Sequence, residues 1–416
     1  MLRREWLQAI TGLGLAGVAS RHQKTSAAMP LRAGAAKVDI TPGGPVSLDG
    51  YLEPDTRVSE GVHDRIYARA VALVQGRRRL ALVSCDLCSL GLADYLERLV
   101  AERCGLAPGE LMLCATHSHS APLLTLNTRF PANVEYTNSL AGRLATAAGE
   151  ALRAVGPARL SVGRGQSAVG VSRRKPMPGG GMEMASNPDG IADPDLLVLL
   201  LSRPGSAPFA ALFDYACHSR SLNRANKLMS GDIFGIAEQA VEKAMPGLAL
   251  AGALAGASGD IDPVSVVSGF EPVGGAPPET VRLGSILGQD VLRAIEAARP
   301  LPPPGTFQAA RVRVALPPRW AGTTRSVTVS LACAGDVALV GLDCEASVEI
   351  GLGIKSKSPF PATFVISHCN GASGYLPVAR QHAEGGYEVD RTGFAPAAAD
   401  LLVRETLARL STLRDR

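Results

Sequence analysis

Short apolar runs alternate along the chain with longer segments in which apolar residues recur every three or four positions. The first pattern predicts buried strands and the second predicts amphipathic helices. Strands are predicted at 36–42, 70–74, 80–84, 111–114, 158–164, 196–201, 209–216, 248–255, 307–316, 327–332, 337–342 and 362–367. Helices are predicted at 92–104, 138–155, 233–245, 279–298 and 395–413. This alternation of the two kinds of element predicts the α/β class.

Turn-forming residues interrupt the pattern at two informative places. Gly76-Arg77-Arg78 separates two strand segments and predicts a hairpin. Residues 175–194 are rich in glycine and proline, and we interpret them as a long loop near a site, suited to act as a lid.

Composition excludes several classes of protein. With 46% hydrophobic and 19% charged residues, the body of this 416-residue chain is a globular protein with a substantial core. The formal net charge is +4, of which residues 1–28 contribute +3, so no electrostatic argument for nucleic-acid binding remains. The eight cysteines lie mostly in apolar runs, and we expect buried free thiols rather than a disulfide framework.

The N-terminus has the pattern of an export signal. The pair Arg3-Arg4 precedes an uncharged, modestly apolar stretch from Ala9 to Ala19, which is similar to a twin-arginine signal. We therefore expect residues 1–30 to direct export to the periplasm or outside the cell. The alternative is a retained membrane anchor. No transmembrane span is expected in the mature chain.

Histidines stand at the ends of predicted strands. The segment Thr116-His117-Ser118-His119-Ser120 follows a buried strand, and side chains at i and i+2 of an extended segment point to the same side. His218 follows another strand in the same way. Neutral imidazole is the commonest metal ligand, so the repeated arrangement favours a metal site over ordinary turns.

Carboxylates occupy comparable positions. Asp260 and Asp262 lie in a Gly-Asp-Ile-Asp-Pro turn after the strand at 248–255, and Glu345 follows the strand at 337–342. We interpret Asp262 either as a functional residue or as a turn-capping residue. His368, near Tyr375, is interpreted as a packed strand end.

Five motifs in this order resemble the neutral/alkaline ceramidase family: Thr116–Ser120, Cys217-His218 with Ser230-Gly231-Asp232, Gly259–Pro263, Glu345 with Glu349-Ile350-Gly351, and Gly374-Tyr375-Leu376-Pro377. The resemblance covers residues 32–416 and implies one large α/β domain with a central mixed β-sheet flanked by helices. It also implies one zinc ion held by His117, His218, Glu345 and Tyr375. By the same match, His119 and an arginine, for which we favour Arg173, would contact the substrate.

Such a zinc site would polarise a carbonyl and activate water for amide hydrolysis. Two departures from the family pattern bear on the substrate. Asp262 replaces a serine thought to take part in catalysis, and this carboxylate could orient or deprotonate a water molecule. By comparison with the family, we also expect no equivalent of its C-terminal β-sandwich domain in this chain. We therefore expect a small-molecule or lipid-like amide substrate, with ceramide itself in doubt.

Two alternatives stay open from the sequence. The same polarised carbonyl would serve an esterase or lactonase. A non-catalytic envelope binding protein would carry a purely structural metal, closed by four protein ligands and without an open coordination position.

Overall fold

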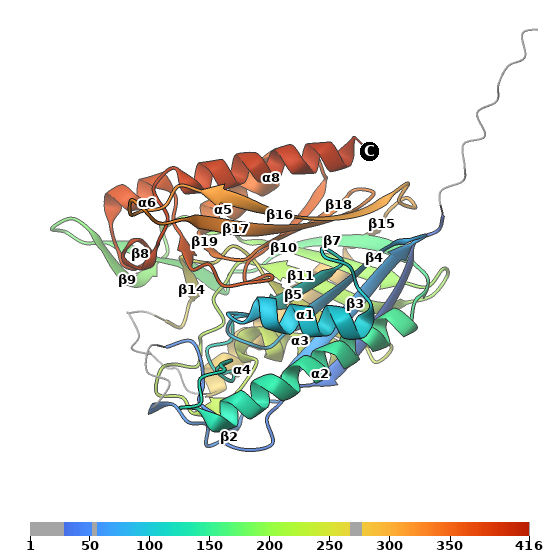
Figure 1. The fold of residues 1–416 in the computed structure, drawn as a ribbon, viewed down its shortest axis with the longest axis horizontal. Helices are drawn as coiled ribbons and strands as arrows, with labels where there is room; N and C mark the ends of the chain where they lie inside the picture. The colour runs from blue at the N-terminus through green and yellow to red at the C-terminus, as the bar shows by residue number, and fades with distance from the viewer. Residues whose placement is uncertain (1–28, 52–55, 267–276, 416) are drawn as a thin grey trace, which may run out of the picture.

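The computed structural model describes residues 29–51, 56–266 and 277–415 (Figure 1). The expected export signal, residues 1–30, therefore lies outside the described residues except for its last two positions. None of the helices in the described ranges is long and apolar enough to cross a membrane. All eight cysteines are free, and seven of them are buried, as expected from their apolar surroundings.

The first of three mixed sheets is built from an antiparallel meander that continues into a parallel pair. Its strands lie in the order β5-β4-β3-β1-β6. The first three strands of the meander pair antiparallel, whereas β5 pairs parallel with β4 across a helical crossover. The elements are β1 (Arg32–Asp39), β3 (Tyr67–Gln75), β4 (Arg78–Cys85), α1 (Ala93–Cys104), β5 (Leu111–Ala115), α2 (Pro131–Arg153) and the edge strand β6 (Gly156–Pro157).

The chain repeats this topology twice more. In each repeat, three antiparallel strands are followed by a helix, a fourth strand parallel to the third, and a second helix. The second unit consists of β7 (Arg159–Gln166), β10 (Asp195–Ser202), β11 (Pro208–Tyr215), α3 (Asp232–Ala244), β13 (Leu250–Ala255) and α4 (Pro277–Glu296), with β15 (Arg299–Pro300) at the sheet edge. The third consists of β16 (Phe307–Leu316), β17 (Arg325–Ala334), β18 (Val337–Leu342), α5 (Val348–Lys357), β20 (Ala362–Ile366) and α8 (Ala398–Arg414).

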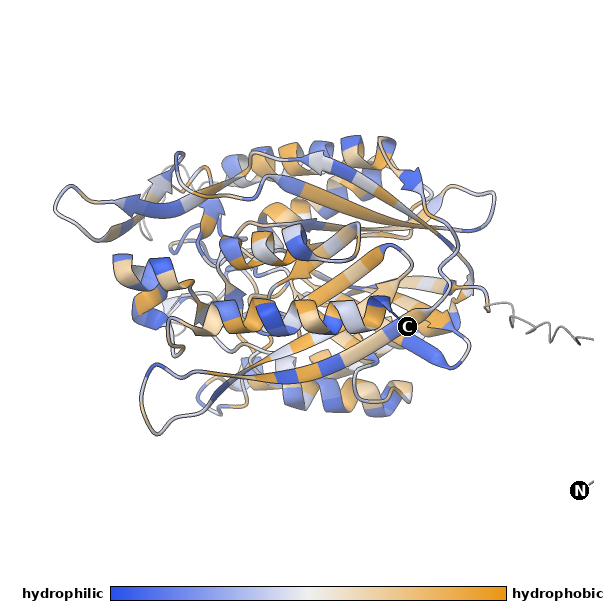
Figure 2. Ribbon diagram, turned by 90° about the horizontal axis from the view of Figure 1, so that it is seen from above, coloured by the Kyte–Doolittle hydropathy of each residue, from blue (hydrophilic) through white to orange (hydrophobic). Residues whose placement is uncertain are grey.

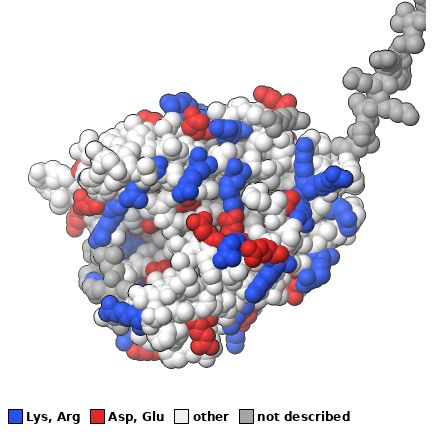
Figure 3. All heavy atoms as spheres, in the orientation of Figure 1, with Lys and Arg blue, Asp and Glu red and all other residues white. Residues whose placement is uncertain are grey.

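The inner faces of the three sheets share one core. Leu82, Leu212 and Leu339, one from each sheet, belong to the same buried cluster. Each outer face packs on the helices of its own unit: α1 and α2, α3 and α4, or α5 and α8. Figure 2 shows the resulting pattern, with hydrophobic strands inside and helices that carry both colours outside. On the outer face that Figure 3 shows, basic and acidic side chains are interspersed. Since both faces of the sheets are covered, the central strands carry apolar residues without alternation.

The α/β class and the mixed character of the sheet are confirmed, but one central sheet is replaced by three around a shared core. The loop expected at 175–194 is wrong. Instead, β8 (Gly170–Pro176) and β9 (Met182–Asn187) form an antiparallel hairpin. The prolines and glycines do not prevent it, because Pro176 ends a strand and the positive φ angles of Gly180 and Gly181 fall in the turn.

Short elements complete the fold near the strand ends. β14 (Ile261–Pro263) pairs with β8, and β19 (Glu345–Ala346) pairs parallel with β21 (Tyr375–Leu376). The helices α6 (Ala379–Glu384) and α7 (Tyr387–Arg391) follow. The remaining pair joins β2 (Gly61–Val62) to β12 (Leu228–Met229).

Candidate metal centre and adjoining cavity

The carboxyl ends of the parallel strand pairs from all three sheets meet at one place. Ligands of α/β proteins bind outside such strand ends. The loops that leave the strands supply Cys88 after β4, His117 and His119 after β5, His218 after β11, Asp260 and Asp262 after β13, Glu345 after β18 and His368 after β20. Four of the seven histidines of the chain are therefore gathered there.

His117 and His218 present the same ring nitrogen to the centre. Nδ1 of His117 lies 2.7 Å from the backbone oxygen of Cys88, and Nδ1 of His218 lies 2.6 Å from that of Ser258. A carbonyl can only accept, so Nδ1 carries the hydrogen in both rings and each Nε2 keeps its lone pair. Metal-ligating histidines are commonly oriented in this way, by a backbone carbonyl that accepts from the other ring nitrogen.

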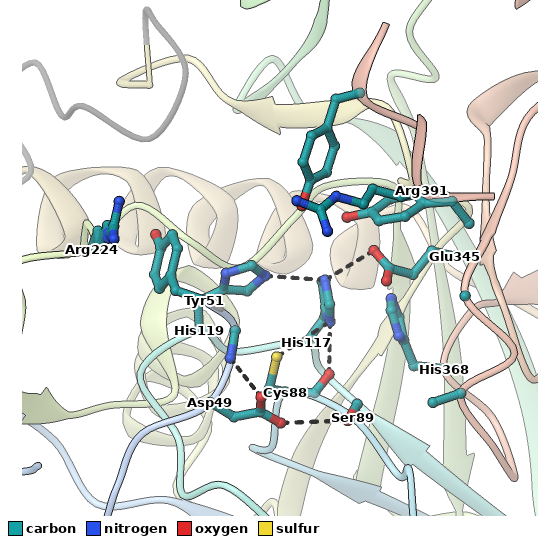
Figure 4. A pocket seen from close by; sticks show the side chains of 15 residues that line it. Asp49, Tyr51, Cys88, Ser89, His117, His119, Arg224, Glu345, His368 and Arg391 are labelled. Carbon is teal, nitrogen blue, oxygen red and sulfur yellow. Dashed lines mark hydrogen bonds and ion pairs between the residues drawn. The ribbon is translucent and has the colours of Figure 1, made fainter. Parts of the chain in front are cut away.

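The third donor is the carboxylate of Glu345. Its Oε2 atom lies 3.6 Å from Nε2 of His117 (Figure 4) and 3.6 Å from Nε2 of His218, and the donor atoms of all three residues lie within 4.8 Å of one another. Oε2 is buried and has no hydrogen-bond partner in the described part of the chain. A buried carboxylate oxygen left without a partner, facing two imidazole lone pairs, fits a divalent cation.

Tyr375 is placed beside this set by the sheet register. It is paired directly with Glu345 across β19 and β21. Burial, followed by the charge of Glu345, raises the pKa of Tyr375 well above its usual range. Without a cation, Tyr375 is therefore a neutral phenol and a weak ligand.

A second group of donors, Cys88 with His117 and His119, also lies within 4.8 Å. It fits a metal less well. Burial raises the pKa of Cys88 well above its usual range, and metals bind the thiolate rather than the thiol. In addition, the nitrogen of His117 that faces Cys88 already donates to its carbonyl.

His119 and His368 lie against the ring of His117. Nε2 of His119 is 3.2 Å from Nε2 of His117, and the ring of His368 is stacked on that of His117. Burial, followed by the neighbouring His117, lowers the pKa of both His119 and His368 well below its usual range. Both imidazoles are consequently neutral in this cluster.

Arg173 and Asp262 form a buried charge network next to the histidines. Nη1 of Arg173 lies 3.2 Å from Nε2 of His218 and 3.3 Å from Oδ1 of Asp262, and its Nε donates to Glu388 at 2.8 Å. Arg220 forms a two-pronged ion pair with Asp262, with Nε 2.6 Å from Oδ1. Both oxygens of Asp262 are therefore occupied.

The electrostatics of Asp262 follow from these contacts. Burial opposes ionisation, but Arg220 and then Arg173 outweigh it and hold the pKa of this carboxyl well below its usual range. A carboxylate with such a low pKa is a poor proton acceptor at neutral pH. The environment therefore favours an electrostatic role over the proton-transfer role considered from the sequence.

A cavity of about 390 Å³ opens beside the metal-ligand candidates (Figure 4). This volume lies within the range typical of small-molecule sites. Four of the residues predicted from the sequence line this cavity: His117, His119, Glu345 and Tyr375. Three others, His218, Arg173 and Asp262, are not among its lining residues. The lining residues not predicted from sequence are Asp49, Gly50, Tyr51, Cys88, Ser89, Arg224, His368, Ala372, Gly374, Tyr387 and Arg391.

Only some of these additional residues carried a signal in the sequence. His368 follows β20 as His117 follows β5, two residues after the last paired position, so the pattern that identified one histidine also applied to the other. Tyr387 and Arg391 lie on a five-residue helix after the last strand, and neither spacing nor motif distinguishes them.

The fold and this centre define an α/β protein with a candidate metal site at converging strand ends. Residues 31–263, more than half of the chain, match the family model described as neutral/alkaline non-lysosomal ceramidase, N-terminal. The chain therefore belongs to the neutral/alkaline non-lysosomal ceramidase family, which confirms the resemblance inferred from its motifs.

Individual relatives agree with this assignment. The chain is 28% identical over 255 residues to neutral ceramidase B of Dictyostelium discoideum, covering 56% of this chain and 35% of that protein. It is 26% identical over 245 residues to neutral ceramidase A of the same organism, covering 53% and 33%. The match thus spans about a third of the length of these relatives.

Solved structures share the fold. Neutral ceramidase from Pseudomonas aeruginosa superimposes with a TM-score of 0.76 at 20% identity, covering 93% of this chain and 75% of that one. A structure described as ceramidase complexed with C2 gives a TM-score of 0.77 at 19% identity, covering 93% and 76%. At this level of identity, the likeness establishes the fold.

Proposed function

We propose that this chain is a zinc-dependent hydrolase of amide bonds, with residues 32–416 as its catalytic domain. The observation that carries the proposal is the convergence of His117, His218 and Glu345, whose donor atoms lie within 4.8 Å of one another. Two neutral imidazoles and a carboxylate suit zinc, and three protein ligands beside a cavity leave room for water and substrate. Tyr375 would be a fourth, weaker ligand.

When bound there, Zn²⁺ would polarise the substrate carbonyl and lower the pKa of a water molecule. In the overall reaction, the carbon–nitrogen bond breaks, the hydroxyl of water joins the acyl carbon and its proton goes to the amine. His119 lines the cavity, and its Nδ1 atom has no hydrogen-bond partner in the described part of the chain, so this ring is placed to pass a proton from water to the leaving nitrogen. Because its pKa is lowered well below the usual range, His119 would hold that proton only briefly before giving it up. This assigns to His119 the proton transfer of the reaction.

Arg173 and Asp262 would act together rather than separately. The guanidinium of Arg173 is fixed by Asp262, Glu388 and the carbonyl of Gly259, so that its Nη1 is held next to His218. Fixed positive charge beside a reacting carbonyl stabilises developing negative charge. We assign Asp262 the role of positioning Arg173 and Arg220, in place of the base considered from the sequence.

The family and the names of the relatives support an amide substrate. The esterase or lactonase alternative uses the same polarised carbonyl. A panel of N-acyl amides and matched esters with the same acyl chain separates these activities by the ratio of their kcat/KM values. We also propose that residues 1–30 are an export signal, which fractionation of the producing cells tests directly.

The decisive experiment is elemental analysis of the purified full chain beside two variants. We expect about one zinc per chain in the wild type, loss of zinc in His117→Ala, and retention in His382→Ala, whose histidine lies on α6 outside the cavity. Amide hydrolysis should follow the zinc content in all three proteins. A wild type that takes up no zinc from buffered zinc, or that hydrolyses amides equally well after chelation, would refute the mechanism.

A further inference from the structure

Two arginines line the cavity without a role in the proposed mechanism, Arg224 and Arg391, and Arg391 is the one on the side of Glu345 (Figure 4). Arg391 lines the same cavity as His117 and Glu345. It is the last residue of α7, and its guanidinium carbon lies 5.4 Å from the centre of the Tyr387 ring. Figure 4 shows Arg391 on the Glu345 side of the cavity, opposite Tyr51. A cation of this kind is therefore within the space that a substrate would occupy.

Three buried arginines around the centre are paired with protein carboxylates. Arg173 pairs with Glu388 and Asp262, Arg220 with Asp262, and Arg174 with Glu384 and Glu388. The positive charges of these three guanidiniums are therefore neutralised by carboxylates of the protein itself.

Arg391 differs from them. In the described part of the chain no carboxylate lies within 4.0 Å of its guanidinium, which lies over the ring of Tyr387. A ring held against one face of a guanidinium leaves the edge of the fork available for a planar anion. A cation in a cavity wall without a protein counter-ion is suited to a ligand's negative charge.

The cavity wall also contains two acidic residues, Asp49 and Glu345, which have contacts of their own. Asp49 is half-buried and accepts from the backbone N–H of Gly50, while Glu345 faces the two imidazoles. In the proposed hydrolase the charge of Glu345 would be offset by the cation held there, and the scissile carbonyl would occupy that position. A separate negative charge on the substrate would then need a cation elsewhere in the wall, such as Arg391. The single positive charge of a guanidinium matches the single negative charge of a carboxylate.

We propose that Arg391 binds a carboxylate of the substrate, so that the preferred substrates are N-acyl amino acids rather than neutral N-acyl amino alcohols. This inference rests on the proposed amide hydrolysis and specifies its substrate class. Arg391 is then a specificity-determining residue: it holds the carboxylate while the amide carbonyl lies at the centre formed by His117, His218 and Glu345.

The test compares two substrates that differ only in charge, N-lauroylglycine and N-lauroylglycinamide, on the zinc-loaded full chain. We expect kcat/KM of the wild type to be about tenfold higher for the carboxylate, as one charge-assisted contact supplies. Arg391→Gln should remove this preference by lowering only the carboxylate's value, and Arg391→Lys should retain part of it. Arg409→Gln, which changes an exposed arginine of α8, should behave as the wild type.

Two results would overturn the inference while leaving the proposed function intact. One is equal turnover of both substrates by the wild type. The other is an equal effect of Arg391→Gln on both substrates, which would indicate a general disturbance of the cavity.

Calorimetric titration of the same proteins with N-lauroylglycine and N-lauroylglycinamide separates the two proposals when turnover is absent. Tighter binding of the carboxylate, lost in Arg391→Gln, would support the anion site and refute the hydrolase. Equal binding of both compounds would overturn the anion site.

Discussion

The imidazole rings of His117 and His368 stack nearly parallel, with their centroids 3.8 Å apart and an angle of 15° between their planes. The two residues come from different sheets, and each lies two positions after the last paired residue of a parallel strand. Both also have positive φ angles, 63° and 53°. Backbone strain of this kind is typical of functional sites, where the surrounding structure must enforce it.

We predict that His368 acts by fixing the ring of His117. His368→Ala removes the stacked ring, so the direction of the His117 lone pair is less restricted, and zinc affinity should fall by about tenfold. His368→Phe keeps a flat ring and should bind zinc nearly as the wild type does. Competition with a chromophoric chelator measures both affinities, and thermal unfolding checks that each variant is folded. Equal loss in the two variants would instead indicate that a ring nitrogen of His368 is needed.

Asp262 gives a prediction about stability. Asp262→Asn leaves Arg220 and Arg173 buried without their shared carboxylate, which should cost about 3–5 kcal/mol of unfolding free energy. Urea denaturation measures this difference. Asp336→Asn is a suitable control, because its ion pair with Arg414 is on the surface and contributes less than about 1 kcal/mol. If Asp262→Asn kept full stability and lost only turnover, the assignment of Asp262 as a base would be restored.

Glu345 and Tyr375 are neighbours in register, but they should differ as ligands. Glu345 carries the negative charge of the set, whereas burial raises the pKa of Tyr375 well above its usual range. We expect Tyr375→Phe to retain zinc through gel filtration and Glu345→Gln to lose it. The zinc-to-protein ratio of each eluted variant is the measurement. Loss of zinc from Tyr375→Phe would show that the phenolate is an essential ligand.

The fold was predictable where hydrophobic periodicity is strong. The strands at 307–316 and 337–342 agree with β16 and β18 to the residue: β18 is buried along its whole length, and β16 pairs with β17 along its whole length. The hairpin of β8 and β9 was missed because β8 also pairs with β14, which is distant in sequence, and the two strands have no strong apolar pattern of their own. Similarly, the division into three sheets depends on which strand edges meet, and no local pattern encodes that.

The site was predictable only in part, for a related reason. Histidines and carboxylates after buried strands identified His117, His218 and Glu345, since the strand itself places the side chain. The pairing of Arg220 with Asp262, which changes the chemistry of that carboxylate, joins two loops from different strands. A residue's own sequence neighbourhood indicates where it lies, whereas its protonation depends on partners brought there by the fold.

The last prediction concerns pH and a carboxyl group of the core. Burial raises the pKa of Asp214 on β11 to about 7 from the ordinary value of 3.8, although Lys355 lies 3.8 Å away and the N–H of Val365 donates to it. Between about pH 4 and pH 7 the folded chain therefore holds a proton that the unfolded chain has released, so stability is greatest at the acidic end of this window and declines as pH rises.

Asp214→Asn, which resembles the protonated group, should remove that decline, a difference in slope of up to about 1.4 kcal/mol per pH unit. Urea denaturation at pH 5, 6, 7 and 8 measures the slope for the wild type, for Asp214→Asn and for the surface control Asp336→Asn. The control should keep the wild-type slope. If all three proteins showed the same slope, Asp214 would be ionised throughout this range, and the ion pair with Lys355 would outweigh its burial.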